Sequence, residues 1–432
     1  MDDRLLVQGI AASIEKHLAD PDQNLDLEKI SGYSESHLRQ KFYNVTGETP
    51  SAYLRRRRLT EAARALIAGG RIVDVAATYG YSSQDNFTTA FKSWFGMTPG
   101  ELRTTHRRYN DFLQRMKEPL SVMTELANLK QDSLNTTLMS SIKGASEFFD
   151  LDWSTAKLFG YSTHAFTINI HNELCPSSPY CWNKDRFFLA LRDIGIRKTD
   201  TIQLKRGAPS EVLNEVEARI KAHLDMGKLC ILDSLEHQLI EGYDLKGFRL
   251  LQPFQCSPGI LKSTLSFGAH NEALEQDGWV AFTLLERDDL RANEDRLLHS
   301  ALETALSMRS SPEKFQWPNY RFGDGAWETW LAGIETGLGS SHGHWWSGTV
   351  WMECRAMAAN FFEEIEPAMK SRKAAELSKE IAMMYRECSG KLNIARNKGA
   401  TAAAQRTALS EGRELDSRCT GLMKELLADS GA

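Results

Sequence analysis

The chain has 432 residues, of which 42% are hydrophobic and 25% are charged. This length is about three times that of the commonest domain, so we expect at least two hydrophobic cores. The composition excludes a disordered, collagen-like or rod-shaped protein. We expect no signal peptide, and no apolar run reaches the about 18 residues needed to cross a membrane. Seven cysteines without the spacing of a metal site favour a reducing compartment. We therefore expect a cytoplasmic protein with no bound metal or cofactor.

Positive charge is concentrated near the N-terminus. From Lys29 to Arg108 the chain has 13 Lys and Arg against 6 Asp and Glu, a net charge of +7, which leaves −12 for the other residues. A basic segment beside an acidic remainder is typical of a nucleic-acid-binding module joined to a separate domain. Segregation by chance is the alternative.

Residues 1–108 carry a helical pattern. Apolar residues at steps of four predict a first helix over residues 6–18, and residues 25–30 predict a short second one. A turn at Gly32-Tyr33 then precedes a helix that buries Leu38 and Phe42. After Pro50, a longer amphipathic helix over residues 53–66 carries four consecutive arginines near its start.

The first arrangement then recurs. Gly32-Tyr33-Ser34 reappears as Gly80-Tyr81-Ser82, and Gly47-Glu48-Thr49-Pro50 as Gly96-Met97-Thr98-Pro99. The offset is 48 residues for the first motif and 49 for the second, so one structural unit is used twice. In the second copy, residues 72–76 form the short helix, Ser82 or Ser83 caps the next helix, and Phe87 and Phe91 form its buried face. We expect two tandem helix-turn-helix units.

These residues resemble the DNA-binding region of the AraC/XylS family of bacterial transcription regulators. The resemblance covers about residues 6–104, and its most specific part runs from Ile72 through Phe95-Gly96-Met97-Thr98-Pro99 to Leu102-Arg103. It implies an all-α domain over residues 1–108 that binds double-stranded promoter DNA. RNA polymerase is a further partner that the resemblance allows.

The polar faces of the two recognition helices are the candidate DNA-binding residues. Guanidinium and amide groups can form paired hydrogen bonds with base edges, so Arg39, Gln40, Gln84 and Asn86 are the best base readers. An ordinary solvated helix face is the alternative for each residue. The full candidate set is Ser36, His37, Arg39 and Gln40 in the first unit, Gln84, Asp85, Asn86, Thr88 and Thr89 in the second, and Arg55, Arg56 and Lys92 toward phosphate.

Residues 109–432 show a mixed pattern, which predicts a linker over 109–133, an α+β domain over 134–367 and a helical tail over 368–432. Helices are expected at 134–149, 186–194 and 209–224, strands at 228–233, 238–243, 248–251 and 279–285. The first three strands should form an antiparallel meander. The tail either covers its own domain or pairs with a second copy.

Three features of this region could carry chemistry. His237 follows Glu236 and begins a strand that ends at Asp244, so a hydroxyl or thiol nucleophile such as Thr137 or Cys175 could complete a hydrolase-like set. A structural histidine is the alternative. Trp327, Trp330, Trp345 and Trp346 form core or a ligand cage. His342, His344 and Cys354 lack a metal-site spacing.

The region from about residue 134 to 364 also resembles the papain-like fold of the butirosin-biosynthesis acyltransferase and bacteriocin-processing peptidase group. The matching residues are Gly160 with His164-Ala165-Phe166, the strand His237 to Asp244, Gly323 to Trp330, and Cys354-Arg355 with Ala358 and Phe361. Where that group places its nucleophilic cysteine, this chain has Asn135-Thr136-Thr137. The resemblance therefore implies a catalytically inactive cleft that binds a small molecule through Thr137, His164, His237, Tyr243, Asp244 and the four tryptophans 327, 330, 345 and 346.

The sequence thus predicts a one-component transcription regulator, not an enzyme, whose C-terminal domain senses a small-molecule effector. A DNA-tethered papain-like hydrolase or acyltransferase is the alternative. The scattered cysteines allow a third hypothesis, a thiol-based redox regulator.

Overall fold

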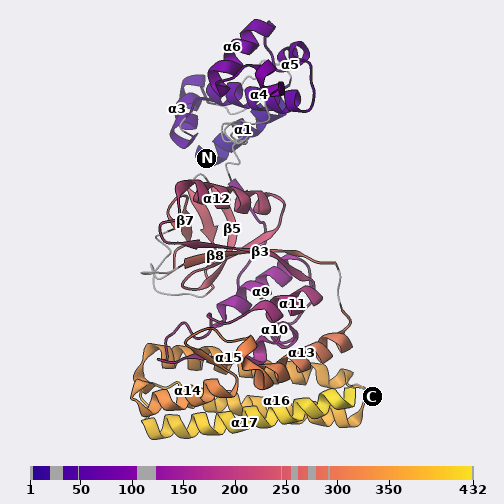
Figure 1. Cartoon of the computed structure of the whole chain (residues 1–432), viewed down its shortest axis with the longest axis vertical. Helices are drawn as coiled ribbons and strands as arrows, with labels where there is room; N and C mark the ends of the chain where they lie inside the picture. The colour runs from indigo at the N-terminus through magenta and orange to yellow at the C-terminus, as the bar shows by residue number, and fades with distance from the viewer. Residues whose placement is uncertain are drawn as a thin grey trace. The chain divides into compact units, whose positions relative to one another are not determined.

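The computed structural model describes residues 3–19, 33–46, 48–104, 123–244, 246–253, 261–270, 279–289 and 292–430. The chain divides into an N-terminal unit, Met1–Glu125 with Tyr243–Gly247, and a C-terminal unit, Leu126–Gly242 with Phe248–Ala432 (Figure 1). In the part of the chain that the structure describes, no helix has both the length and the apolar character that a membrane crossing requires.

The N-terminal unit is helical, as the periodicity predicts. Its described helices are α1 (Asp3–Lys16), α3 (Glu35–Thr46), α4 (Pro50–Ile67), α5 (Ile72–Thr78), α6 (Gln84–Phe95) and α7 (Pro99–Thr104). The short helix expected over residues 25–30 lies outside the described residues. The two copies of the repeat are therefore visible as α3 in the first and as α5 with α6 in the second.

Two small apolar cores hold this unit together, and α4 belongs to both. Near its start, Tyr53 packs with α1 and with Leu38 and Phe42 of α3. Beyond Leu59 it packs with the short helix α5 and with Phe87 and its two following phenylalanines on α6. The long helix thus joins two similar modules.

Local chemistry fixes where these helices begin and end. The hydroxyl of Thr49 accepts a hydrogen bond from the backbone of Ala52, with Pro50 in the first turn of α4. The Ser83 hydroxyl accepts one from the backbone of Asn86, 3.1 Å away, and caps α6. Gly96, with φ of 73°, ends α6 in the left-handed conformation that favours glycine.

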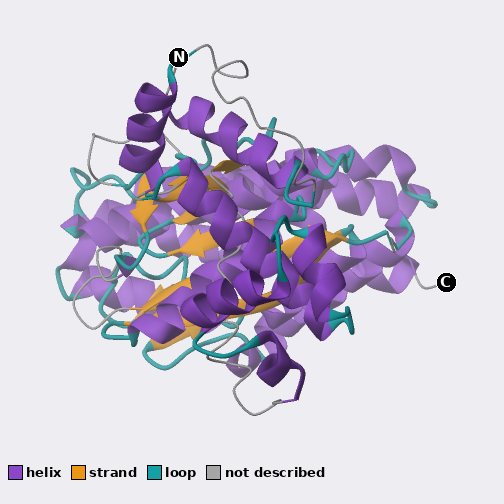
Figure 2. Ribbon diagram, turned by 90° about the horizontal axis from the view of Figure 1, so that it is seen from above, coloured by secondary structure: helices purple, strands orange, loops and turns teal. Residues whose placement is uncertain are grey.

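The C-terminal unit contains a sheet with the strand order β3-β8-β4-β5-β6-β7. The strands are β3 (Ile196–Lys205), β4 (Leu229–Asp233), β5 (His237–Asp244), β6 (Gly247–Leu250), β7 (Thr264–Ser266) and β8 (Trp279–Arg287). β4 runs antiparallel to β5, as expected, and β8 runs antiparallel to both β3 and β4. Four of these strands match the predicted ones, whereas β3 and β7 were not predicted. Figure 2 distinguishes the strands from the helices.

Helices cover both faces of this sheet. Figure 1 shows α12 (Ser210–Asp225) on one face and α9 (Thr137–Phe148) with α11 (Asp185–Asp193) on the other. Side chains alternate accordingly along each strand. Leu204 and Phe282 face α12, whereas Gln203 of β3 and Thr283 of β8 face α9 and α11. The second of these faces forms the wall of the pocket described below.

The remaining helices form a second layer. They are α10 (Thr155–Tyr161), α13 (Glu294–Ser310), α14 (Asp324–Glu335), α15 (His342–Ile365), α16 (Arg372–Ala395) and α17 (Ala402–Ser430), with the small sheet of β2 (Asn169–His171) and β9 (Tyr320–Phe322). A buried ion pair of 2.9 Å between Arg355 of α15 and Asp416 of α17 joins the tail to this layer. The tail therefore covers its own domain, one of the two alternatives, and the unit is α+β with a helical tail.

Candidate nucleic-acid interface and pocket

Helix α6 presents a polar face to solvent. Its apolar side buries Phe87, Phe91 and Phe95 in the second core of the N-terminal unit. The predicted contact residues lie on the rest of its surface: Gln84, Asp85, Asn86, Thr89 and Lys92 are exposed, and Thr88 is half-buried. The side-chain amide of Asn86 donates to the Ser82 hydroxyl at 3.0 Å, which holds it at the start of the helix. A rigid, capped helix with an amide-rich open face suits a major groove.

Helix α3 repeats this arrangement in the first unit. It buries Leu38 and Phe42, and leaves Ser36, His37, Arg39 and Gln40 exposed. The amide nitrogen of Gln40 donates to the side chain of Asn44 at 2.8 Å. The candidate base readers of both units therefore stand on open helix faces.

The four arginines of α4 divide into exposed and buried residues. Arg55 is exposed. Arg56 was expected to meet phosphate, but it is buried and its Nη2 lies 2.7 Å from a Glu48 oxygen. Arg57 is buried between Glu15 and Glu61, at 2.8 and 2.9 Å. We therefore assign Arg56 to a structural ion pair and not to a phosphate contact. Its guanidinium is buried and already paired with the Glu48 carboxylate, so it is not available to a phosphate.

In the C-terminal unit, a network of hydrogen bonds surrounds Glu236. The hydroxyls of Thr137 and Tyr180 both donate to its carboxylate at 2.7 Å, and Trp346 Nε1 donates to the Tyr180 oxygen at 2.8 Å. Burial raises the pKa of Glu236 to about 7, although the two hydroxyl donors oppose this shift. The network joins α9, β5 and α15 through residues that are far apart in the sequence.

The carboxylate that faces His237 is Asp233, not Asp244. His237 Nε2 lies 3.3 Å from Asp233 Oδ2, because the two residues pair across the tight turn between β4 and β5. Burial opposes ionisation of Asp233, but His237 and Lys184 outweigh it and hold the pKa of Asp233 below its usual value. Asp244 and buried Tyr243 lie at the other end of β5, where Asp244 accepts the backbone N–H of Lys246 at 2.7 Å.

Thr137 is placed like a nucleophile at the first turn of a helix, but its surroundings oppose that role. Its Oγ1 lies 3.5 Å from His237 Nδ1 and accepts the backbone N–H of His237 at 3.2 Å. Its hydroxyl donates to Glu236 at 2.7 Å, so in this geometry His237 does not accept the Thr137 proton. The side chain is also fully buried. Thr137 therefore behaves as a structural link between α9 and β5.

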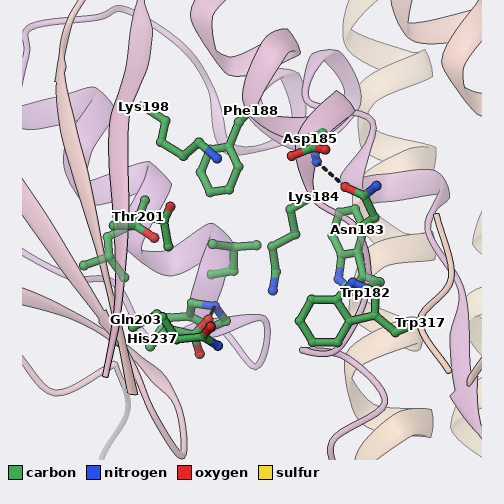
Figure 3. A pocket seen from close by; sticks show the side chains of 15 residues that line it. Trp182, Asn183, Lys184, Asp185, Phe188, Lys198, Thr201, Gln203, His237 and Trp317 are labelled. Carbon is green, nitrogen blue, oxygen red and sulfur yellow. Dashed lines mark hydrogen bonds and ion pairs between the residues drawn. The ribbon is translucent and has the colours of Figure 1, made fainter. Parts of the chain in front are cut away.

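A pocket of about 270 Å³ lies beside His237, between the sheet and helices α9 and α11 (Figure 3). Its apolar lining is Leu138, Trp182, Phe188, Ile231 and Trp317. Its polar lining is Asn183, Lys184, Asp185, Lys198, Thr201, Gln203, Asp233, His237 and Thr283, with Ala281 between them. Of the predicted ligand residues, only His237 lines this pocket. Such a mixed lining, with several convergent polar groups, is typical of small-molecule sites.

The four tryptophans of the predicted cage lie outside the pocket beside His237. Trp327 and Trp330 are fully buried and stack at 6.1 Å, with their Nε1 atoms donating to Asp416 and His344 at 2.9 Å. Trp345 lies under the ammonium of Lys398, and Trp346 belongs to the Glu236 network. These four residues are corrected to packing and network positions, since none of them lines the pocket.

The other predicted histidines are packed inside the helical layer. His344 accepts from Trp330 at Nδ1, and its Nε2 lies 2.7 Å from the Ala395 carbonyl. His164 is buried, with its ring 5.6 Å from that of Trp182, and burial lowers its pKa to about 3. Among the described residues, no group of His, Cys, Asp and Glu could hold a metal ion.

The cysteines of the described residues are all free. Four of them, Cys230, Cys354, Cys388 and Cys419, are buried, and Cys175 and Cys181 are half-buried. Burial raises the pKa of Cys354 to about 12 and that of Cys388 to about 11. Such thiols are poor nucleophiles near neutral pH.

Comparison with known proteins concerns the N-terminal unit. A family model described as a helix-turn-helix domain matches residues 27–105. The chain is 38% identical over 97 residues to the uncharacterized HTH-type transcriptional regulator YbfP of Bacillus subtilis. The aligned residues are 22% of this chain and 33% of YbfP. It is 40% identical over 107 residues to the right origin-binding protein of Escherichia coli. These residues are 24% of this chain and 36% of that protein.

A shorter relative is matched over most of its length. The HTH-type transcriptional activator AarP of Providencia stuartii is 33% identical over 109 residues, which is 25% of this chain and 81% of AarP. The chain thus spans only about a third of YbfP and of the right origin-binding protein, and most of AarP. By its tandem helix-turn-helix unit, this chain belongs to the AraC/XylS family of DNA-binding transcription regulators.

Proposed function

We propose that the chain is a one-component transcription regulator, in which the N-terminal unit binds promoter DNA and the C-terminal unit senses a small molecule. One observation carries the first half of this proposal: α6 buries its phenylalanines and leaves its amide-rich face open. The family membership supports the same conclusion. The second half rests on the pocket beside His237.

The proposed DNA contacts divide by chemistry. Arg39 and Gln40 of α3, and Gln84 and Asn86 of α6, read base edges. Arg55 and Lys92 are exposed cations that contact phosphate, which positions the protein without reading sequence. The remaining exposed or half-buried residues of the two faces complete the surfaces: Ser36, His37, Asp85, Thr88 and Thr89.

Footprinting of the full chain on the DNA upstream of its own operon tests this half. We expect a protected region that is lost when Gln84 and Asn86, or Arg39 and Gln40, are changed to Ala, because each lost bidentate pair costs about 1–3 kcal/mol. Asn214→Ala is the matched control, since Asn214 is exposed on α12 of the other unit. Protection that survives both double variants contradicts the proposed interface.

The C-terminal unit acts, in this proposal, as a sensor with an enzyme-like but catalytically inactive site. An effector can regulate only if its affinity differs between two states of the protein. The resemblance to the papain-like group suggests how such a site arose, and the enclosed Thr137 hydroxyl supports the loss of catalysis. The Glu236 network connects the pocket residue His237 with α9 and α15, which gives a ligand a route to affect packing.

A DNA-tethered acyltransferase or hydrolase is the second candidate, favoured by the contact of Thr137 with His237 and of His237 with Asp233. Stopped-flow measurement with p-nitrophenyl acetate separates the two. We expect no burst of nitrophenol above the background rate, because the Thr137 side chain is fully buried and does not line the pocket. A burst that disappears in both Thr137→Ala and His237→Ala would contradict the sensor hypothesis and support the enzyme hypothesis.

A further inference from the structure

The pocket beside His237 contains two lysines held by aromatic rings. Lys198 Nζ lies 4.5 Å from the centre of the Phe188 ring. Figure 3 shows these two side chains next to each other. Lys184 Nζ lies 5.8 Å from the Trp182 ring and donates to the Tyr180 carbonyl. The charge of Lys184 acts on Asp233 and that of Lys198 on Asp200, but neither lysine lies within ion-pair distance of a carboxylate in the described ranges. Rings hold an ammonium from one side and leave N–H donors on the other for an anion.

Lys198 faces the pocket because β3 contains a bulge. Strict alternation from Thr201 and Gln203, which line the pocket, would turn residue 198 toward the opposite face. The register shifts between Lys198 and Asp200, so that Lys198 pairs with Leu285, whereas Asp200 pairs with Leu284. The extra residue returns Lys198 to the pocket face. Bulges commonly redirect a side chain in this way beside functional sites.

The nearby carboxylates do not neutralise Lys198. Asp233 is paired with His237, and Lys184 also helps to hold its charge. Asp200 is hydrogen-bonded by Arg219 at 2.6 Å, which is the largest cause of its lowered pKa, whereas the charge of Lys198 is the smallest of the named causes. Asp185 is exposed at the start of α11, where solvent screens its charge. Lys198 is therefore the cation of this pocket whose charge is least compensated.

The rest of the lining defines the body of a ligand. Trp182, Phe188 and Trp317 supply flat apolar surfaces, and Thr201 and Gln203 supply polar groups on the strand that carries Lys198. A volume of about 270 Å³ suits a molecule with a single ring or a short acyl chain. We propose that the pocket binds a small organic acid, with its carboxylate on Lys198 and its ring or chain against these aromatic side chains. This inference rests on the proposed sensor function, because it names the ligand class of the same pocket.

Three probes of one shape test the charge preference: phenylacetate, phenylacetamide and phenethylamine, which carry a negative charge, no charge and a positive charge. Binding to the full chain without DNA is measured by calorimetry and by quenching of tryptophan fluorescence. We expect phenylacetate to bind with a Kd in the millimolar range or tighter, at least about tenfold more tightly than the amide. The amine should bind most weakly.

Variants assign the preference to Lys198. Lys198→Gln should remove the advantage of phenylacetate over phenylacetamide, and Lys198→Arg should keep most of it. Lys221→Gln is the matched control, because Lys221 also lies over a phenylalanine ring, that of Phe267, and does not line this pocket. It should leave all three affinities unchanged.

Equal affinities for the acid and the amide, tighter binding of the amine, or no binding of any probe at about 10 mM would overturn the inference. So would a preference for phenylacetate that survives Lys198→Gln. Because this measurement contains no DNA, its failure is distinct from failure of the footprint. A chain that protects DNA but shows no preference for the acid retains its promoter-binding role and loses this ligand class.

Discussion

The recognition face of α6 and the pocket beside His237 are both polar surfaces, but they are built in opposite ways. The face of α6 consists of neighbouring residues on one helix, which project outward and depend on the fold only through the phenylalanines behind them. The pocket takes its polar groups from α11, the two residues before it, and the four strands β3, β4, β5 and β8. A buried hydrogen-bond network lies beside them. Changes on α6 should therefore affect binding alone, whereas changes around the pocket should affect stability as well.

The largest change in stability is expected for a buried charged residue of the N-terminal unit. Arg57 is buried, joins α4 to α1 through Glu15, and also pairs with Glu61 of its own helix. Arg57→Ala leaves these carboxylates without their shared partner, so we expect a loss of about 2–4 kcal/mol in the free energy of unfolding of this unit. Hydrogen exchange of α1 and α4 in the full chain measures it.

The control is two residues away. Arg55 is exposed on the same helix, and Arg55→Ala should change the free energy of unfolding by less than about 0.5 kcal/mol. Equal protection of α1 in wild type and Arg57→Ala would show that the buried pair contributes nothing, and that the contrast between inner and outer charges does not hold within this unit.

A smaller change in the free energy of unfolding, which depends on pH, is expected when Glu236 is replaced. Its pKa is raised from 4.5 to about 7 in the folded chain, so between these values the unfolded chain loses its proton first. The contribution of Glu236 to the free energy of unfolding is therefore largest below about pH 4.5. It falls by about 3 kcal/mol at most as the pH rises to about 7. Glu236→Gln removes this loss, and should stabilise the chain at pH 8 but not at pH 4.5.

Urea unfolding followed by tryptophan fluorescence measures this difference, because nine of the ten tryptophans lie beyond residue 150. Glu215→Gln, at an exposed position of α12, is the control and should change stability equally little at both pH values. If wild type and Glu236→Gln show the same dependence on pH, the buried carboxylate is not the group that titrates.

The same contrast explains which features the sequence could predict. The helices of the N-terminal unit follow from signals within a few residues, such as the Ser83 cap, Gly96 and the spacing of Phe87 and Phe91. The prediction placed Arg56 toward phosphate, whereas the structure buries it against Glu48. Glu48 precedes the helix, and nothing in the spacing shows that the two residues meet inside the fold.

The pocket depends on contacts that a local pattern does not contain. Strand β3 was missed because its pocket face carries Thr201 and Gln203, so its apolar alternation is weak, and its bulge interrupts the period. Glu236 meets Thr137 across about a hundred residues. One signal was present: the short turn after Asp233 predicts that Asp233 and His237 lie opposite each other. It identifies Asp233, rather than Asp244, as the partner of His237.

The smallest change in DNA affinity is expected for a residue that contacts phosphate only and so positions the protein on DNA without reading bases. Arg55 lies on an open face of α4 and carries no structural ion pair among the residues described. A single phosphate contact releases about one counterion, so Arg55→Ala should weaken binding to specific and random duplexes to the same degree and lower the salt slope of log K by about 1. Filter binding at several salt concentrations measures this slope. A loss confined to the specific duplex would instead make Arg55 a base reader, because phosphate carries no sequence information.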